Sequence, residues 1–307
     1  MNLFFTILVD NVAPIFLIIL VGYIVGKRIA LNIHTLTKIN IYIFVPALIF
    51  VKVTETEITG EMLGAFGFTL ALMLAMSMVN AVVARMRKSP KSLANAMKNS
   101  ILFYNSGNMG LPLIMLLYDQ LPQAVSIQVM VFLAQNICTN TFGMYNASRG
   151  NSDVKSSILK VMKIPTVYAV ILAFLFKLAG VDLTRFFIWP AARFISNGLV
   201  PIALITLGVQ LSLIKINLKN TDVYMAGFLR LICGPLIAFA LLNVFGFKGI
   251  TAQVLLISSS VPTAVNTALM AIEFENEPEF ASQVVATTTL LSAITMSCVI
   301  YIAQWLY

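Results

Sequence analysis

Long runs of apolar residues follow one another along the whole chain, with only short polar joints between them. A helix needs about 20 apolar residues to cross a hydrocarbon core of about 30 Å. Spanning segments must be helical, because an open strand would leave its backbone groups unpaired in lipid. We therefore predict an all-α polytopic membrane protein with ten transmembrane helices. Their ranges are 4–26, 35–53, 62–84, 92–117, 122–146, 163–180, 187–212, 222–246, 249–272 and 280–305.

The composition agrees with this pattern and excludes several chemistries. Of 307 residues, 59% are hydrophobic and only 10% are charged, and the mean hydropathy is +0.92. A soluble domain carries roughly 25% charged residues, so there is too little polar surface to cover a water-soluble fold of this size. His34 is the only histidine, which argues against histidine metal clusters and histidine-dependent catalysis. The three cysteines lie inside apolar runs and predict no disulfide framework.

The net charge of +8 comes from basic residues scattered among the joints. We interpret them as a membrane-orientation signal and expect no nucleic-acid partner. With the N-terminus outside, the inner joints hold fourteen of the twenty Lys and Arg residues. The sequence therefore predicts a multi-pass protein of the plasma (cytoplasmic) membrane with both termini extracytoplasmic. One inner joint is acidic instead, although carboxylates weigh little in this rule.

The least apolar stretch in the middle, 147–163, divides the spans five and five, so we predict repeats at 1–155 and 156–307. Landmarks recur between them at offsets of 150 to 155 residues. The pairs are Pro14 with Pro165, Lys27 with Lys177, Pro46 with Pro201 and Pro112 with Pro262. Because five is odd, the second copy enters the membrane in the opposite direction, as in many secondary transporters. Coincidence among the eleven prolines is the alternative.

Spans four and nine both contain polar, proline-bearing interruptions. Pro112 has no N–H, so it deprives the Asn108 carbonyl of its helical partner, and Pro262 does the same to Ser258. Interrupted helices at corresponding places of two inverted halves indicate a transport site, and their N-terminal ends suit an anion. Ordinary proline kinks are the alternative. The predicted substrate-binding residues are Asn105, Gly107, Asn108, Gly110, Pro112, Ser260, Pro262, Thr263 and Asn266.

Weaker candidates lie on other spans, and each has a structural alternative such as a hinge or a bond between helices. They are Asn40, Pro46, Asn136, Asn140 and Arg230. We expect Arg230, the one clear charge inside a span, to snorkel to the inner surface, although an intramembrane charge can also mark a substrate site. Freed carbonyls could hold a cation, so sodium near Ser258 and Asn108 stays open as a metal site. No carboxylate falls at mid-membrane, which disfavours a proton relay.

Three motifs together resemble a known family, the auxin efflux carriers, over the whole chain. They are NIYIFVPALIF at 40–50, NSGNMGLP at 105–112 and SSVPTAVN at 259–266. The resemblance implies a scaffold domain and a moving transport domain, with helices four and nine crossing at their proline breaks. It also implies a small organic anion bound at the crossover, by Asn108, Gly110, Pro112, Pro262, Thr263 and Asn266. The chain lacks the long insert between spans five and six of many plant members, and its architecture is also similar to sodium–bile acid symporters.

We therefore predict a secondary transporter of a small organic anion (a carboxylate, dicarboxylate or auxin-like acid) with elevator-type alternating access. A sodium-coupled organic anion symporter is the alternative, followed by a permease subunit of a larger complex or a membrane-embedded enzyme. The chain has no His-Glu-x-x-His motif, no paired intramembrane aspartates and no Walker-type loop, so we expect no enzyme and no cofactor. The expected partners are the anion and the lipid bilayer, and a homodimer is left open.

Overall fold

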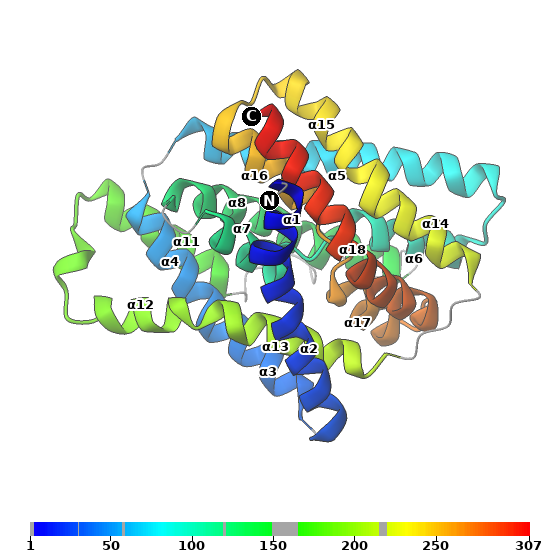
Figure 1. The fold of residues 1–307 in the computed structure, drawn as a ribbon, viewed down its shortest axis with the longest axis horizontal. Helices are drawn as coiled ribbons and strands as arrows, with labels where there is room; N and C mark the ends of the chain where they lie inside the picture. Colours follow the sequence, from blue (N-terminus) through cyan, green and yellow to red (C-terminus); the bar gives the residue numbers. More distant parts are fainter. Residues whose placement is uncertain (1–2, 30, 57–58, 119–120, 149–164, 215–219) are drawn as a thin grey trace.

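The computed structural model describes residues 3–29, 31–56, 59–118, 121–148, 165–214 and 220–307, and these residues are almost entirely helical (Figure 1). The helices of the first half are α1 (Leu3–Thr6), η1 (Ile7–Val12), α2 (Ala13–Arg28), α3 (Ile33–Ile39), η2 (Asn40–Phe44), α4 (Val45–Glu55), α5 (Gly60–Met86), α6 (Lys91–Leu102), η3 (Ser106–Gly110), α7 (Leu111–Leu117), α8 (Pro122–Cys138), η4 (Thr139–Gly143) and α9 (Met144–Ala147). Those of the second half are α11 (Pro165–Leu178), η5 (Leu183–Arg185), α12 (Trp189–Asn197), α13 (Leu199–Ser212), α14 (Thr221–Phe228), η6 (Leu229–Cys233), α15 (Gly234–Phe245), α16 (Gly249–Ser259), α17 (Val265–Glu273) and α18 (Pro278–Leu306).

Helix occupies each of the ten predicted spans, and consecutive segments such as α1, η1 and α2 form single rods. Within the described residues, six of these rods are long and apolar enough to cross a membrane by themselves. Two predicted spans, 92–117 and 249–272, fall short because each is interrupted by non-helical residues. The all-α membrane architecture is confirmed, whereas the arrangement as an inverted repeat remains a prediction.

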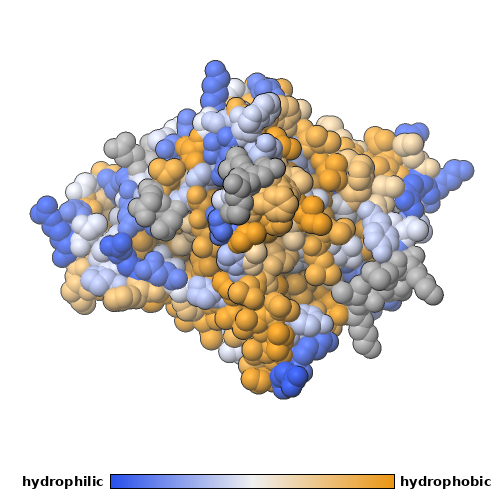
Figure 2. Space-filling model, viewed as in Figure 1, coloured by the Kyte–Doolittle hydropathy of each residue, from blue (hydrophilic) through white to orange (hydrophobic). Residues whose placement is uncertain are grey.

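The outer surface has the apolar character of a protein in lipid. Figure 2 shows hydrophobic residues over much of one face, with hydrophilic residues gathered toward its edges. Large side chains such as Phe187, which is 91% exposed, and Trp305 stand on this surface. A contiguous apolar surface of this extent is costly in water but favourable against hydrocarbon. The chain is therefore a multi-pass membrane protein.

The helices pack in two groups, which we call the first and the second bundle. In the first bundle, α2 and α3 pack on α13, and α4 packs on α11 and α12. In the second bundle, α5 packs on α6, α8 and α15, while α18 packs on α14, α16 and α17. Figure 1 shows the first bundle in the lower part of the view and much of the second above it. The bundles meet where α13 touches η3 and α7, where α4 touches α8, and where η1 touches α18.

Small residues let α2 and α13 cross backbone to backbone. A Cβ atom at Gly22 would lie 2.3 Å from the Ile205 carbonyl oxygen, and one at Gly208 would lie 2.0 Å from that of Ile19. Gly26 faces Ser212 in the same way. Close approach through small residues is how membrane helices gain packing energy when lipid is as apolar as their side chains. This contact joins α2 and α13 closely within the first bundle.

Four of the helical rods contain a wide turn just before a proline. The π-helical segments η1, η2, η3 and η6 each end two residues before a proline. In each, the residue just before the proline donates to the carbonyl five residues back, as Leu111 does to Ser106. The wide turn accommodates the missing N–H and the bulk of the ring. The prolines that follow them are Pro14, Pro46, Pro112 and Pro235.

The expectation that Pro112 breaks span four is therefore wrong. The interruption lies at residues 103–105, and Pro112 sits in the first turn of α7 within a continuous helix. In span nine the interruption covers residues 260–264, with Pro262 at its centre as predicted. Only the second break is made at its proline.

Candidate functional site

The two interruptions lie side by side and pair with each other. Tyr104 and Thr263 form an isolated antiparallel bridge. The Asn105 N–H donates to the Pro262 carbonyl at 2.8 Å, and the Ala264 N–H donates to the Phe103 carbonyl at 2.9 Å. Broken backbone inside a membrane protein needs such partners, because an unpaired polar group in a dry environment costs several kcal/mol. The two breaks therefore complete each other.

Side chains from α8 and α18 hold this pair in place. The Gln135 side chain on α8 donates to the Leu102 carbonyl and accepts from the Tyr104 N–H, each at 3.3 Å. On α18, the Thr288 hydroxyl oxygen accepts from the Thr263 N–H at 3.2 Å. The Thr263 hydroxyl donates to the Ser100 carbonyl at 2.7 Å, and this bond connects the second break to α6, the helix that precedes the first break.

Arg230 reaches the same place from η6 and does not snorkel to a surface as we expected. Its side chain is 0% exposed. Its guanidinium donates to the Ile101 carbonyl at 3.0 Å and to the Ser259 carbonyl, and lies 4.7 Å from the centre of the Tyr104 ring. A buried guanidinium persists only where acceptors surround its planar fork. The carbonyls at the two helix ends supply an acceptor for each terminal nitrogen, while the buried Nε has no hydrogen-bond partner among the described residues.

A small polar cavity of about 60 Å³ lies on the other side of the paired segments. Residues of both bundles line it, and none of those described carries a charged side chain. Its volume suits a few water molecules or one small ligand. The lining residues are Thr37, Asn40, Ile41, Val45, Tyr104, Asn105, Ser106, Gly107, Asn108, Phe132, Gln135, Asn136, Thr139, Gln210, Ala264, Val265 and Asn266.

Two helix N-termini border this cavity. The rod η3–α7 begins at Ser106, where the Asn105 side chain accepts from the Asn108 N–H at 3.2 Å and leaves the Gly107 N–H without a partner among the described residues. Helix α17 begins at Val265 with no side-chain cap, and the N–H groups of its first two residues have no described partner. Free N–H groups and the positive ends of two helix dipoles therefore face one small space.

Amide side chains connect the two bundles across the cavity. The Asn40 amide nitrogen, from the first bundle, donates to the Asn108 side-chain oxygen at 2.8 Å. Asn136 lines the opposite wall, and its side-chain oxygen accepts from Asn140 at 2.9 Å. Among the described residues, the Asn266 side chain makes no hydrogen bond and is exposed. The cavity thus offers amide groups that are positioned but not all engaged.

Two larger clefts toward one end of the molecule share lining residues with the cavity. It shares Gln210 and Val265 with a cleft of about 340 Å³ that reaches Ile33 and Glu279. It also shares Asn266 with a cleft of about 310 Å³ that reaches Glu273. These far residues lie beside the joints after α2, α13 and α17. Both clefts therefore lie between the cavity and this end.

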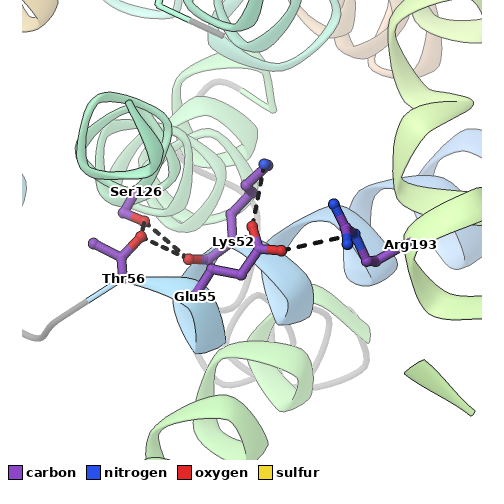
Figure 3. Close-up of polar contacts among 5 residues, drawn as sticks. All are labelled: Lys52, Glu55, Thr56, Ser126 and Arg193. Carbon is purple, nitrogen blue, oxygen red and sulfur yellow. Dashed lines mark hydrogen bonds and ion pairs between the residues drawn. The ribbon is translucent and has the colours of Figure 1, made fainter. Parts of the chain in front are cut away.

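At the opposite end, the two bundles touch through polar side chains (Figure 3). The Ser126 hydroxyl of α8 donates to the hydroxyl oxygen of Thr56, the residue that follows α4, at 2.7 Å. It also donates to the carbonyl of Lys52, which lies within α4, at 3.2 Å. Glu55 beside them pairs with the Lys52 ammonium at 3.3 Å and with Arg193 of α12 at 3.9 Å. The bundles are therefore in contact at one end, and at the other end both of them line the cleft of about 340 Å³.

The predicted site residues divide by their place in this arrangement. Asn105, Gly107, Asn108, Asn266, Asn40 and Asn136 line the cavity. Ser260, Pro262 and Thr263 lie in the paired segment behind it, Asn140 lines a neighbouring cleft, and Ser258 is buried at the end of α16. Gly110, Pro112 and Pro46 lie within helices outside the cavity lining, and a Cβ at Gly110 would meet Gln128 at 2.5 Å.

Sequence reasoning missed several lining residues. Gln135 and Gln210 are buried amides inside apolar helices, the same signal that pointed to Asn136, and both could have been found that way. Tyr104 and Phe132 carry no comparable signal, because aromatic residues are common throughout apolar spans. Only the pairing of the two breaks brings Tyr104 to the cavity.

The chain is similar to known transporters over nearly its whole length. Residues 7–300 match the family described as membrane transport protein. An "Uncharacterized transporter" of Methanocaldococcus jannaschii is 24% identical over 298 residues, covering 94% of this chain and 96% of the relative. Another from Methanothermobacter thermautotrophicus is 21% identical over 298 residues, covering 94% and 95%. These matches confirm the family resemblance and favour a transporter over an enzyme, and the chain belongs to the membrane transport protein family as a multi-pass membrane transporter.

Proposed function

We propose that this transporter carries a small organic anion with at least one carboxylate, bound in the cavity beside the paired breaks. The observation that carries the proposal is the meeting of two helix N-termini with unpartnered N–H groups in one cavity. Backbone N–H groups at helix N-termini bind anions because the donors and the dipole act together. The amides of Asn108 and Asn266 add donors of the kind that orient a carboxylate.

The charge of the cavity favours a ligand of low charge. None of the described lining residues is acidic, so no side chain there repels an anion. None is basic either, so the attraction comes from backbone groups and amides that are already in place. Such donors bind without the desolvation cost of a lysine or arginine side chain. A mono- or dicarboxylate fits this field better than a phosphate ester of higher charge.

Helix packing supports the proposed inverted repeat. Exchanging the two halves converts the packing of α2 on α13 into that of α11 on α4. The same exchange converts α5 on α8 into α14 on α18, and α7 on α8 into α17 on α18. Gln135 and Thr288, which bond to the bridge partners Tyr104 and Thr263, also come from corresponding helices. The boundary proposed between residues 155 and 156 lies outside the described residues.

The two bundles support an elevator-type movement. The cavity is walled mostly by the second bundle, while five lining residues come from the first, namely Thr37, Asn40, Ile41, Val45 and Gln210. Sliding the second bundle would carry the bound anion and the paired breaks together, past the first bundle, in which α2 and α13 cross closely. With the basic joints inside, the open clefts face the cytoplasm, and the contact of Ser126 with Thr56 closes the extracytoplasmic side.

A thermal-shift experiment with the purified protein tests the anion. Malonate and malate should raise the melting temperature, because a ligand at 100 times its Kd stabilises the folded state by about 2.7 kcal/mol. Malonamide, which has the same size and no charge, should not. Equal stabilisation by malonamide and malonate, or none by any mono- or dicarboxylate, would contradict the proposal.

A cross-link tests the movement. The hydroxyls of Thr56 and Ser126 are 2.7 Å apart, so cysteines at both positions, in a background without the three native cysteines, should form a disulfide. The oxidised protein should still bind malonate but should not exchange it in proteoliposomes, and reduction should restore exchange. Unchanged exchange in the fully oxidised protein would contradict the elevator.

Cysteine labelling tests the orientation. A single cysteine at Ser89 should resist an impermeant thiol reagent added from outside the cell, and one at Thr59 should react. The opposite result would reverse the proposed orientation and make the observed state outward-open.

A further inference from the structure

We propose that Arg230 is a built-in cation of the anion site, holding the place between the C-terminal ends of α6 and α16 that a coupling sodium ion would otherwise fill. The transporter then binds its anion without sodium. This inference rests on the proposed function and deepens it, because it decides between an uncoupled anion carrier and a sodium symporter.

The carbonyl ends of two broken helices meet at Arg230. Helix α6 ends at Leu102 and α16 ends at Ser259. The last four carbonyls of a helix lack helical partners and carry its negative dipole end. Exposed carbonyls and C-terminal ends of broken helices are what coordinates sodium or protons in many secondary transporters. Arg230 donates to one carbonyl of each end, at Ile101 and at Ser259.

The surroundings fit a guanidinium more closely than a free ion. The Tyr104 ring covers one face of it at 4.7 Å. On another side, a Cβ atom at Gly234 would lie 2.9 Å from a terminal nitrogen of the guanidinium, so the glycine leaves the space that this group occupies. The π turn η6 just before Gly234 and Pro235 carries the arginine. These features place the side chain between the helix ends in one position.

No carboxylate neutralises this charge within the described part of the chain. Arg230 forms no ion pair there, and no cluster of three acidic, cysteine or histidine residues is present that could hold a metal. Among the described residues, the two helix ends and the Tyr104 ring are what face its positive charge. Because Tyr104 lines the anion cavity while covering Arg230, one aromatic ring separates a permanent cation from the proposed anion. A sodium ion would supply the same field only while bound.

The test compares ions and variants without any organic anion. Wild-type protein should have the same melting temperature in sodium, potassium and choline chloride at equal concentration, and should show no saturable binding of radioactive sodium. Arg230→Ala should melt at least about 6 °C lower, because two charged hydrogen bonds are lost. Methylguanidinium at about 10 mM should return about 3 °C of this loss, as expected for a ligand at ten times its Kd.

Arg87→Ala is the matched control, because Arg87 pairs with Asp222 at 2.6 Å near the surface. It should not respond to methylguanidinium. Saturable sodium binding or sodium-specific stabilisation of the wild type overturns the proposal, and so does an equal response of Arg230→Ala and Arg87→Ala to methylguanidinium. If Arg230→Ala does not fold, the test consists of the melting temperatures of the wild type and of Arg230→Lys in sodium, potassium and choline chloride. If the sodium and methylguanidinium results overturn this proposal, malonate can still stabilise the protein. If malonate does not bind, the sodium and methylguanidinium results can still support the role of Arg230.

Discussion

The two helix interruptions perform the same task with different chemistry. The first, at residues 103–105, contains neither proline nor glycine, and the N-terminus that follows is capped by Asn105. The second, at residues 260–264, is centred on Pro262, and the N-terminus that follows has no side-chain cap. Both nevertheless end up in one antiparallel pair.

The difference shows that a proline is not required to break a membrane helix. Pro112 is absorbed by the wide turn η3, while the real break seven residues earlier is stabilised by partners from elsewhere in the fold. Those partners are the opposite break, Gln135 and Arg230. A local signal made the second break readable in the sequence, whereas the first depends on tertiary contacts.

Removing the side chain that supports the first break should have the largest effect. Gln135→Leu leaves the Tyr104 N–H and the Leu102 carbonyl unpaired and should cost about 2–6 kcal/mol, since each buried unpaired group costs about 1–3 kcal/mol. Thr288→Val removes the one hydrogen bond that this side chain makes to the second break and should cost about 1–2 kcal/mol. Melting temperatures of the two variants measure the order. Equal losses would show that the two breaks rely equally on outside support.

Changing the donors at each N-terminus should weaken anion binding strongly. Asn108→Asp and Asn266→Asp each remove an amide donor and add a negative charge, and a hydrogen bond to a charged group is worth about 1.5–3 kcal/mol. Malonate affinity should fall by roughly tenfold to over a hundredfold, and Asn108→Ala should be milder than Asn108→Asp. The aspartate still offers an oxygen to Asn40, so the bond between the bundles is kept.

Asn243→Asp is the control for this pair, because Asn243 is exposed on α15 and bonds only to its own helix. Calorimetric titration of malonate should give it wild-type affinity. If the Asn108 and Asn266 variants lose stability but keep normal affinity, the cavity is not the binding site.

Giving the second N-terminus the cap that the first already has should trade binding for stability. Ala264→Ser supplies a hydroxyl that can accept from the free N–H groups of α17, which should stabilise the protein by about 0.5–1 kcal/mol. The same bond competes with the anion, so malonate affinity should fall several-fold. The converse change, Asn105→Ala, should cost about 1 kcal/mol. A cap that stabilises the protein without touching affinity would mean that the anion does not use the end of α17.

The smallest effect is expected at Pro112, where the sequence predicts a break that the structure does not have. Pro112→Ala lies outside the cavity lining and inside a helix that already accommodates the proline. Stability should change by no more than about 1 kcal/mol, and malonate affinity should be that of the wild type. A large loss of affinity in this variant would show that the proline itself shapes the site.

Asn108 and Arg230 illustrate how far sequence reasoning carried. The sequence indicates Asn108 because it lies in the polar, proline-bearing stretch of span four, and it does line the cavity. The sequence indicates Arg230 because it is the one clear charge inside a span, but its expected position at a membrane surface is wrong. Both residues are conspicuous in the chain. Nothing near Arg230 in sequence, however, indicates that two carbonyl ends 129 and 29 residues away would receive its guanidinium.

The sequence alone determined that this protein lies in a lipid bilayer and that its spans are helical. Apolar runs of that length enter lipid, and there a helix pairs the backbone polar groups within the span itself. The same runs located the spans and the two polar stretches within them. Only the tertiary structure decided at which residues the helices are interrupted, which groups pair with the interrupted backbone, and where the Arg230 side chain lies. Those outcomes depend on backbone groups finding partners across the fold, and hydrogen bonds between distant segments leave no periodic trace along the chain.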